Sequence, residues 1–205
     1  MDRAVEALAT GRLVLHPTET VVSLSGDPRN PMAVERAHRI KGYPKPRPFL
    51  CLVADSESAR KLARRWSATA ERLAERFWPG PLTLVVPIAD DRDWPVAKGR
   101  ALALRGVADP VSRELVGAWG GAIFSTSANR RGQAPAARIE DAVRRLADAP
   151  GAEDIALALR PIESGASPAA GRPSTIVDVT GEIPRLVRAG AVGLERLREV
   201  VPEIG

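Results

Sequence analysis

The segment DPVSRELVGAWGGAIFSTSANRRG, residues 109–132, contains the helix-to-strand unit that decides the expected fold. Asp109 and Pro110 supply a polar cap and an early proline, which favours a helix over residues 111–119. Residues 121–125 then form a short apolar run, which is typical of a buried strand. A helix followed by such a strand is the pattern of helices packed on a sheet, and it argues against a helix bundle or a β-sandwich.

The same alternation continues along the chain in both directions. Short apolar runs predict strands over residues 12–16, 48–54, 82–88, 101–105, 121–125, 155–159, 175–179 and 185–188. Helical periodicity predicts helices over residues 3–9, 31–40, 57–66, 68–77, 111–119, 139–146 and 194–200. Asn30, Pro31 and Gly42 supply the cap, the first position and the exit of the second of these helices. The pattern predicts an α/β fold.

Length and composition limit the number of domains and the kind of core. With 205 residues, of which 44% are hydrophobic, the chain can bury one sizeable core, so residues 1–205 are expected to form a single globular domain. Aromatic residues make up only 4%, so aliphatic side chains must fill most of this core. The formal net charge of +5 favours anionic partners such as nucleotides, tRNA or acidic lipid headgroups. A general preference for arginine explains the same charge without a partner.

Cysteine usage and the start of the chain bear on its compartment. Cys51 is the one cysteine, which excludes an intramolecular disulfide and a multi-cysteine metal site, and its apolar neighbours predict a buried, inert thiol. Met1, Asp2 and Arg3, with Glu6 close behind, lack the basic start and apolar stretch of a secretion signal. No segment reaches the ~18 uncharged apolar residues that a membrane span requires. We expect a cytoplasmic protein without membrane contact.

Several common catalytic motifs are absent. The sequence contains neither G-x-x-x-x-G-K-[ST] nor G-x-G-x-x-G. Residues 165–169, GASPA, faintly resemble a serine elbow, but His16 and His38 both precede them, whereas an α/β-hydrolase needs its histidine after the nucleophile. The two histidines have no cysteines at ligand spacing, so no metal ligand is assigned. Each histidine is interpreted as a surface or structural residue.

Five polar stretches remain as candidate elements of a site. In residues 16–20, HPTET, two hydroxyls and a carboxylate follow a strand, which is where ligands bind in an open α/β sheet. A turn with a capping threonine is the alternative. Residues 39–48 hold four cations among three prolines and a glycine. Such a loop can hold its cations against a polyphosphate, or it is only a solvated connection between elements. Residues 77–83, FWPGPLT, are interpreted as a structural turn that aromatic side chains anchor.

The other two stretches are hydroxyl-rich strand ends. If the strand continues beyond Ser125, then Ser125 and Ser127 share one face, and Asn129 can hold the following turn through its side chain. These hydroxyls can bind a carboxylate or a phosphate oxygen, or they form only the polar end of a strand. Residues 172–178, RPSTIVD, and residues 185–190, RLVRAG, add hydroxyls at one strand start and a cation at another strand end.

Taken in order, these stretches closely resemble the YrdC/TsaC family. The shared series is Pro-Thr-Glu-Thr, a lysine-containing basic loop, Trp-Pro-Gly-Pro-Leu-Thr, Ser-Thr-Ser-Ala-Asn, and Ser-Thr-Ile-Val-Asp before Arg-x-Gly, across roughly residues 13–192. The resemblance implies a YrdC-like fold, an open, twisted, mixed sheet flanked by helices. It also implies L-threonylcarbamoyladenylate synthase activity, a nucleotidyl transfer that joins L-threonine, bicarbonate and ATP and releases pyrophosphate. The product serves threonylcarbamoyladenosine modification of tRNA.

The resemblance also implies roles for particular residues. It implies that L-threonine contacts Thr18, Arg105, Ser125 and Ser174. It implies that ATP contacts Lys41, Lys45, Ser127, Asn129 and Arg188, with Lys41 and Arg188 as the catalytic cations. Threonine carbamate must attack the α-phosphorus of ATP, so fixed cations and the magnesium ion that accompanies ATP must offset the repulsion between two anions. The implied partners are ATP, L-threonine and bicarbonate, with tRNA and the downstream threonylcarbamoyl-transfer machinery as further ones.

The chain departs from the family pattern near the expected site. The departures are Val22 for tyrosine, Ser23 for glycine, Tyr43 for arginine, Gly106 for valine and Asp109 for histidine. Tyrosine cannot replace the bidentate phosphate contact of a guanidinium, so Arg47 or Lys45 would have to compensate at Tyr43. These changes leave the predicted fold unaltered but concern the activity directly.

Two other functions therefore stay open. The first is a YrdC-like paralogue with the same pocket and altered or no synthase activity, because a fold does not fix a function. The second is a non-catalytic RNA-binding module, which the basic charge favours, although the sequence has no recognisable RNA-binding signature. Residues 162–173 are rich in glycine and proline and are expected to form a mobile loop that closes over the ligands.

Overall fold

A computed structural model of the chain describes residues 1–90, 93–160 and 171–205. The strands are β1 Leu13–His16, β2 Ser23–Gly26, β3 Leu50–Val53, β4 Leu82–Pro87, β5 Ala101–Gly106, β6 Ile123–Ser127, β7 Ile155–Ala158, β8 Thr175–Asp178 and β9 Arg185–Arg188. Within the described residues they form one sheet in the order β7-β1-β2-β6-β3-β5-β4-β8-β9. The order has two edges, and its pairs are both parallel and antiparallel. The predicted α/β fold with an open, mixed sheet is confirmed.

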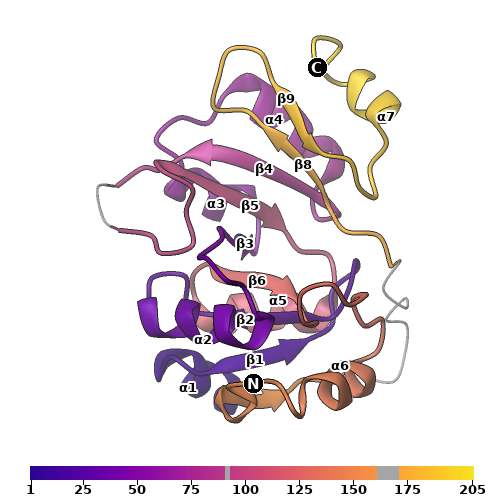
Figure 1. Cartoon of the computed structure of the whole chain (residues 1–205). Coiled ribbons are helices and arrows are strands. Elements are labelled where there is room, and N and C mark those ends of the chain that lie inside the picture. Colours follow the sequence, from indigo (N-terminus) through magenta and orange to yellow (C-terminus); the bar gives the residue numbers. More distant parts are fainter. Residues whose placement is uncertain (91–92, 161–170) are drawn as a thin grey trace.

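Helices cover both faces of this sheet. They are α1 Asp2–Ala9, α2 Pro31–Lys41, α3 Ser56–Leu62, α4 Ala68–Phe77, α5 Pro110–Trp119, α6 Ile139–Leu146 and α7 Leu194–Arg198. Helices α1 and α5 pack with Val14, Leu52 and Ile123 on one face. The other five helices contribute buried side chains to the larger core on the opposite face. Figure 1 shows the N-terminus beside β1 and the C-terminus beside β9, at opposite ends of the sheet.

The local signals at the helix ends are confirmed. Asn30 caps α2 by accepting hydrogen bonds from the backbone amides of Met32 and Ala33, and Gly42 ends the helix at a φ of 65°. Asp109 caps α5 in the same way, by accepting from the amide of Ser112. A positive φ is costly for residues with a side chain, so glycine at position 42 gives a sharp end to α2 before the basic loop.

Two elements differ from the expectations. Strand β2 was not predicted, because its sequence, SLSG, carries one apolar side chain and therefore forms no apolar run, yet it lies between β1 and β6. Helix α3 ends at Leu62 rather than at residue 66, because Ala63 is extended and bridges to Ile88. The first difference matters for function, since β2 carries Ser23.

Three further expectations concern the core, the membrane and a loop. Cys51 is buried, and burial raises the pKa of its thiol to about 12, so it is the inert thiol that was predicted. Among the described residues, none of the helices has the length and apolar character needed to span a bilayer. The loop expected over residues 162–173 falls mostly outside the described residues, so its predicted closure is untested.

Candidate active site

A cavity of about 500 Å³ lies over the middle of the sheet. Its floor is formed by Ser125, Leu50, Ala103 and Val85, which face one another in register across β6, β3, β5 and β4. Residues that are directly paired point to the same side of a sheet. On this side of the sheet, α1 and α5 cover Ile123 and Leu52. These two residues lie two positions from Ser125 on β6 and from Leu50 on β3. The cavity is therefore the uncovered part of the α1/α5 face.

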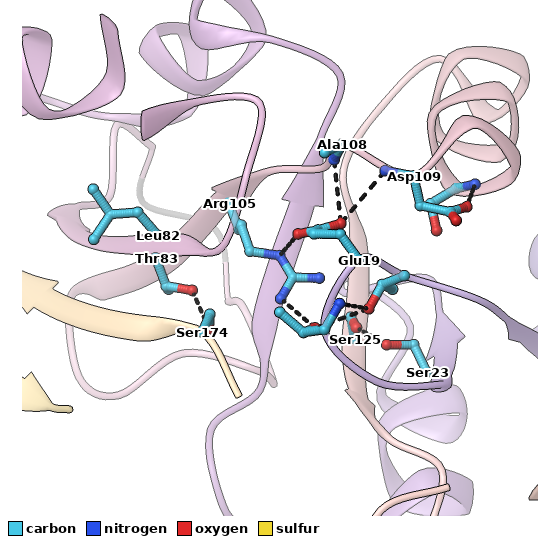
Figure 2. Close-up of polar contacts among 12 residues, drawn as sticks. Glu19, Ser23, Leu82, Thr83, Arg105, Ala108, Asp109, Ser125 and Ser174 are labelled. Carbon is cyan, nitrogen blue, oxygen red and sulfur yellow. Dashed lines mark hydrogen bonds and ion pairs between the residues drawn. The ribbon is translucent and has the colours of Figure 1, made fainter. Parts of the chain in front are cut away.

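Arg105 stands at the inner end of this floor. It follows Ala103 by two residues on β5, so its side chain points to the same face, and it is only 3% exposed. Its Nη1 donates to Thr20 Oγ1 at 3.2 Å, and its Nε lies 3.5 Å from Glu19 Oε1 (Figure 2). Burial lowers the pKa of this guanidinium and the Glu19 carboxylate opposes that shift. Arginine remains charged in such surroundings, so Arg105 provides a fixed cation.

Two pairs of hydroxyls flank Arg105, as Figure 2 shows. Ser23 Oγ and Ser125 Oγ lie 2.8 Å apart on one side, and Thr83 Oγ1 and Ser174 Oγ lie 2.8 Å apart on the other. Within each pair one hydroxyl donates its proton to the other, which leaves one proton per pair for a ligand. The arrangement offers hydrogen-bond donors on both sides of a buried cation, which suits a small anionic or zwitterionic ligand.

Arg188 supplies a second cation from β9, the strand at one edge of the sheet. It pairs with Ile176, and both residues line the cavity, while Thr83 pairs with Ile176 and points to the same side of the sheet. Its Nη2 donates to Ser174 O at 2.7 Å and to Ser174 Oγ at 3.1 Å, and its Nε donates to Ser174 O at 3.1 Å. Burial, and secondarily the like charge of Arg105, lower the pKa of this guanidinium. The two cations are thus close enough to repel, and an anion between them relieves that repulsion.

Lys41, expected to contact ATP, lies behind the cavity wall. Its Nζ donates to Ser127 O at 2.5 Å, to Ser127 Oγ at 3.2 Å and to Asn129 Oδ1 at 2.9 Å. An ammonium group has three N–H donors, so these contacts engage all of them. Burial lowers the pKa of Lys41 to about 8. In this structure Lys41 therefore acts on the cavity through Ser127, which lines it, rather than directly.

Asn129 has the structural role that was predicted for it. Its Nδ2 donates to the carbonyl oxygens of Arg130 and Gln133, at 3.1 and 2.6 Å, and so holds the turn that follows β6. The strand does continue to Ser127, as the face-sharing of Ser125 and Ser127 requires. Both serines line the cavity.

Thr18, expected to contact threonine, is occupied within its own turn. Its hydroxyl donates to the carbonyl of Val21 at 2.6 Å and accepts from the amides of Thr20 and Val21. Because its one proton goes to Val21, the 2.9 Å contact with Thr20 Oγ1 must be donated by Thr20. Thr20, and not Thr18, lines the cavity. Thr18 therefore acts as the capping threonine of a turn, which was the alternative interpretation of residues 16–20.

Of Arg47 and Lys45, the two loop cations proposed to compensate at Tyr43, one lies at the cavity. Arg47 and Tyr43 line the cavity, and the Cζ atom of Arg47 lies 5.1 Å from the centroid of the Tyr43 ring. The backbone amide of Arg47 donates to His38 Nε2 at 3.0 Å. Lys45 is exposed on the same loop and is not among the cavity-lining residues. The geometry thus favours Arg47 over Lys45 as the compensating cation.

His16 has the structural role expected of it. Its Nδ1 lies 2.7 Å from Ser112 Oγ and its Nε2 lies 2.7 Å from Ser25 Oγ, so both ring nitrogens have partners. Burial lowers its pKa to about 4, which keeps the ring neutral at physiological pH. The ring fixes the start of the 16–20 turn against β2 and α5.

The cavity therefore gathers five of the nine residues expected in the site, namely Arg105, Ser125, Ser127, Ser174 and Arg188. Lys41 and Asn129 support Ser127 from behind, while Thr18 and Lys45 lie away from the cavity surface. Six lining residues with polar groups were not among the nine expected, namely Thr20, Ser23, Tyr43, Arg47, Lys98 and Thr126. The alternation of β2 would have indicated Ser23 if that strand had been recognised, whereas no sequence signal marks Lys98.

Comparison with known families agrees with the fold. The Sua5/YciO/YrdC family model, which carries the description "Telomere recombination", matches residues 6–190. The chain belongs to this family. The Sua5/YciO/YrdC match thus takes in every residue of the cavity described above.

Individual relatives share much of the chain. It is 34% identical over 195 residues to a threonylcarbamoyl-AMP synthase of Pyrococcus abyssi, covering 95% of this chain and 55% of that protein. It is 40% identical over 146 residues to a threonylcarbamoyl-AMP synthase of Halorhodospira halophila, covering 69% and 74% of the two chains. The chain thus spans about half of the first relative and about three quarters of the second.

Solved structures give the same picture. The crystal structure of P. abyssi Sua5 complexed with L-threonine is 31% identical, with a TM-score of 0.85, covering 98% of this chain and 58% of that chain. The crystal structure of Escherichia coli YciO, at 22% identity and a TM-score of 0.81, covers 96% and 91% and shows the shared fold.

Two of the departures from the Sua5/YciO/YrdC pattern, Ser23 and Tyr43, line the cavity. Val22 is buried in the core, while the Ser23 hydroxyl pairs with Ser125. A Cβ atom at Gly106 would lie 3.0 Å from the Trp78 ring, so the indole occupies space that a valine would need. Burial raises the pKa of Asp109, which caps α5 beside Glu19. Each replacement has a defined place in the fold.

Proposed function

We propose that the chain is an L-threonylcarbamoyladenylate synthase, which transfers AMP from ATP to the carbamate of L-threonine. The observation that carries this proposal is the cavity that Arg105 and Arg188 line together with Ser125 and Ser127 of β6 and Ser174, which precedes β8. Relatives named threonylcarbamoyl-AMP synthase, at 34% and 40% identity, support the same reaction.

The reaction needs charge stabilisation more than a nucleophile from the protein. The amine of threonine forms a C–N bond with the carbon of bicarbonate, and water leaves. A carbamate oxygen then attacks the α-phosphorus, the bond to the β-phosphate oxygen breaks, and pyrophosphate leaves. Both reactants are anions, so preorganised cations lower the barrier by stabilising charge that is concentrated in the transition state. We assign this task to Arg188.

The cavity offers separate ends for the two substrates. Arg105 with the Ser23–Ser125 pair forms a buried end that fits the carboxylate and small polar groups of an amino acid. A second part of the lining comprises Ser127, Arg47 and Arg188, whose hydroxyl and guanidinium groups suit phosphates. We assign L-threonine to the first end and ATP to the second.

The remaining participants are proposed on chemical grounds. Magnesium would arrive with ATP as its counter-ion. Residues 1–90, 93–160 and 171–205 contain no group of three or more His, Cys, Asp or Glu side chains that could hold a metal, so no residue is assigned to it. Bicarbonate supplies the carbamate carbon, and tRNA and the transfer machinery would use the product.

The deciding experiment measures pyrophosphate release by the protein with ATP, L-threonine, bicarbonate and magnesium. We expect release that requires all four components, together with formation of the threonylcarbamoyl adenylate. A folded protein that releases no threonine-dependent pyrophosphate would contradict the proposal. In that case, salt-sensitive binding of tRNA would favour an RNA-binding module, and its absence would favour a paralogue with other chemistry.

Arg47 and Lys45, the two loop cations proposed to compensate at Tyr43, provide a matched test of the part of the cavity assigned to ATP. Arg47→Ala should raise the KM for ATP about three- to tenfold, because one charge-assisted contact at an exposed rim is lost. Lys45→Ala, two residues away and outside the cavity, should leave this KM unchanged. Equal effects of the two replacements in steady-state kinetics would show that the loop contributes only general positive charge.

A further inference from the structure

Glu19 lies beside Arg105 but is not among the cavity-lining residues, and it has no role in the reaction proposed above. The guanidinium of Arg105 is desolvated, and its ionic partner is Glu19, with Nε and Oε1 separated by 3.5 Å. A buried charge without a partner is strongly unfavourable. Glu19 therefore stabilises the charged form of Arg105, and the position of the Glu19 carboxylate sets the orientation of the Arg105 side chain.

The orientation of the Glu19 carboxylate is itself fixed by backbone groups. Its Oε2 accepts from the amide of Ala108 at 3.2 Å and from the amide of Asp109 at 3.4 Å (Figure 2). These amides lie between β5 and α5, whereas Glu19 belongs to the turn between β1 and β2. The carboxylate thus joins two segments far apart in the sequence and cannot rotate without losing both contacts.

The contacts of Arg105 divide its guanidinium into an occupied and a presented part. Glu19 faces Nε, and Thr20 Oγ1 accepts from Nη1. Neither of these contacts engages Nη2, and Arg105 lines the cavity. The same division explains why Thr20 lines the cavity without offering a proton, since it donates to Thr18 and accepts from Arg105.

One contact in this arrangement is incomplete. Arg105 Nε and Glu19 Oε1 are the two buried side-chain atoms without a hydrogen-bond partner in the part of the chain that the structure describes. Their separation of 3.5 Å exceeds the roughly 2.7–2.9 Å of a charge-assisted hydrogen bond. Buried polar groups are nearly always satisfied, so an exception beside a cavity requires an explanation.

We infer that Glu19 is the positioning residue for Arg105. Its carboxylate holds the guanidinium at Nε, so that Nη2 donates to the carboxylate of an amino-acid ligand. When that anion is bound, the distance between Nε and Oε1 shortens to that of a hydrogen bond. The identity of the ligand rests on the proposed function, whereas the control of the orientation of Arg105 by Glu19 does not. Glu19 itself contacts no reacting atom.

Glu19→Gln tests this inference with little change of shape. The amide oxygen of glutamine can still accept from Ala108, but its NH₂ group faces the N–H of Arg105, so the hold on the guanidinium is lost. We expect the KM for L-threonine to rise about tenfold or more, while the KM for ATP and kcat change little. Glu114→Gln, on the exposed side of α5, is the matched control and should behave like the parent.

A purely structural role for Glu19 would move both KM values and the melting temperature together, and that result would overturn the inference. So would an unchanged KM for L-threonine. If Glu19→Gln does not fold, Glu19→Asp, which keeps the charge and shortens the side chain, can replace it. This variant should also raise the KM for L-threonine, by a smaller factor, with little change in the KM for ATP.

A ligand-free crystal structure of Glu19→Gln, or of Glu19→Asp if needed, separates this inference from the proposed function. Arg105 should turn away from the cavity in the variant, and an unchanged guanidinium would refute the positioning role. A parent protein that neither binds nor uses L-threonine would refute the proposed function, while the orientation of Arg105 would still decide the role of Glu19.

Discussion

Replacement of Arg188 by alanine is expected to lower kcat/KM for ATP about 100- to 1000-fold, the usual effect of removing a preorganised group that stabilises transition-state charge. The variant loses a cation that faces the cavity, and it also releases Ser174, which receives three hydrogen bonds from the guanidinium. The KM for L-threonine should therefore rise as well, although the two residues were expected to act on different substrates. Steady-state pyrophosphate release with each substrate varied in turn measures both effects.

Strand β9 provides the control for this variant. Arg185 lies on the same strand, but it is exposed and its Nη2 pairs with Asp178 Oδ2 at 3.2 Å, outside the cavity lining. Arg185→Ala should retain nearly full activity. Arg188→Lys should recover little, because an ammonium group cannot form the planar, two-nitrogen contact with Ser174 O. If Arg188→Ala is as active as Arg185→Ala, Arg188 has no part in the reaction.

The second large effect is a pH dependence that originates at Lys41. Burial lowers the pKa of this residue to about 8, so the ammonium behind Ser127 loses its charge as the pH rises through that value. We expect kcat/KM for ATP to fall about tenfold per pH unit above this pKa, since that ratio reports on groups of the free enzyme. The Lys41→Arg variant keeps its charge, so its profile should lack this alkaline decline.

Stability should change in the opposite direction over the same pH range. The unfolded chain keeps the proton of Lys41 up to the ordinary pKa of 10.5, whereas the folded chain releases it near 8. Between these values the unfolded state binds more protons, so the contribution of Lys41 makes unfolding less favourable as the pH rises. Denaturant unfolding of the parent and of Lys41→Met isolates this contribution. If activity and stability decline together in the parent, alkaline unfolding and not Lys41 explains the lost activity.

The predictable part of the site consists of residues whose geometry follows from their own strand. Ser125 and Ser127 share a face because they are two residues apart on β6, and Asp109 caps α5 because it precedes Pro110. Local spacing and capping preferences are properties of a short segment. They could therefore be inferred without knowledge of any neighbouring strand.

The hydrogen-bond partners of the site residues were not predictable in the same way. Lys41 was expected to contact ATP, but its three donors are engaged by Ser127 and Asn129, which lie 86 and 88 residues further along the chain. Thr18 was expected to contact threonine, but a carbonyl three residues away takes its proton. Whether a polar side chain is free for a ligand depends on every group within about 3 Å of it, and most of those groups belong to other elements.

The amino-acid sequence by itself determined which segments form helices and most of the strands, how α2 and α5 are capped, and which residue types carry the chemistry. The tertiary structure alone decided the strand order, including the insertion of β2 beside β6, and with it the pairing of Ser23 with Ser125 and of Glu19 with Arg105. The physical reason is that periodicity and capping act over a few residues, whereas the burial of a charge and the sharing of a proton are settled between chain segments that meet only in the folded sheet.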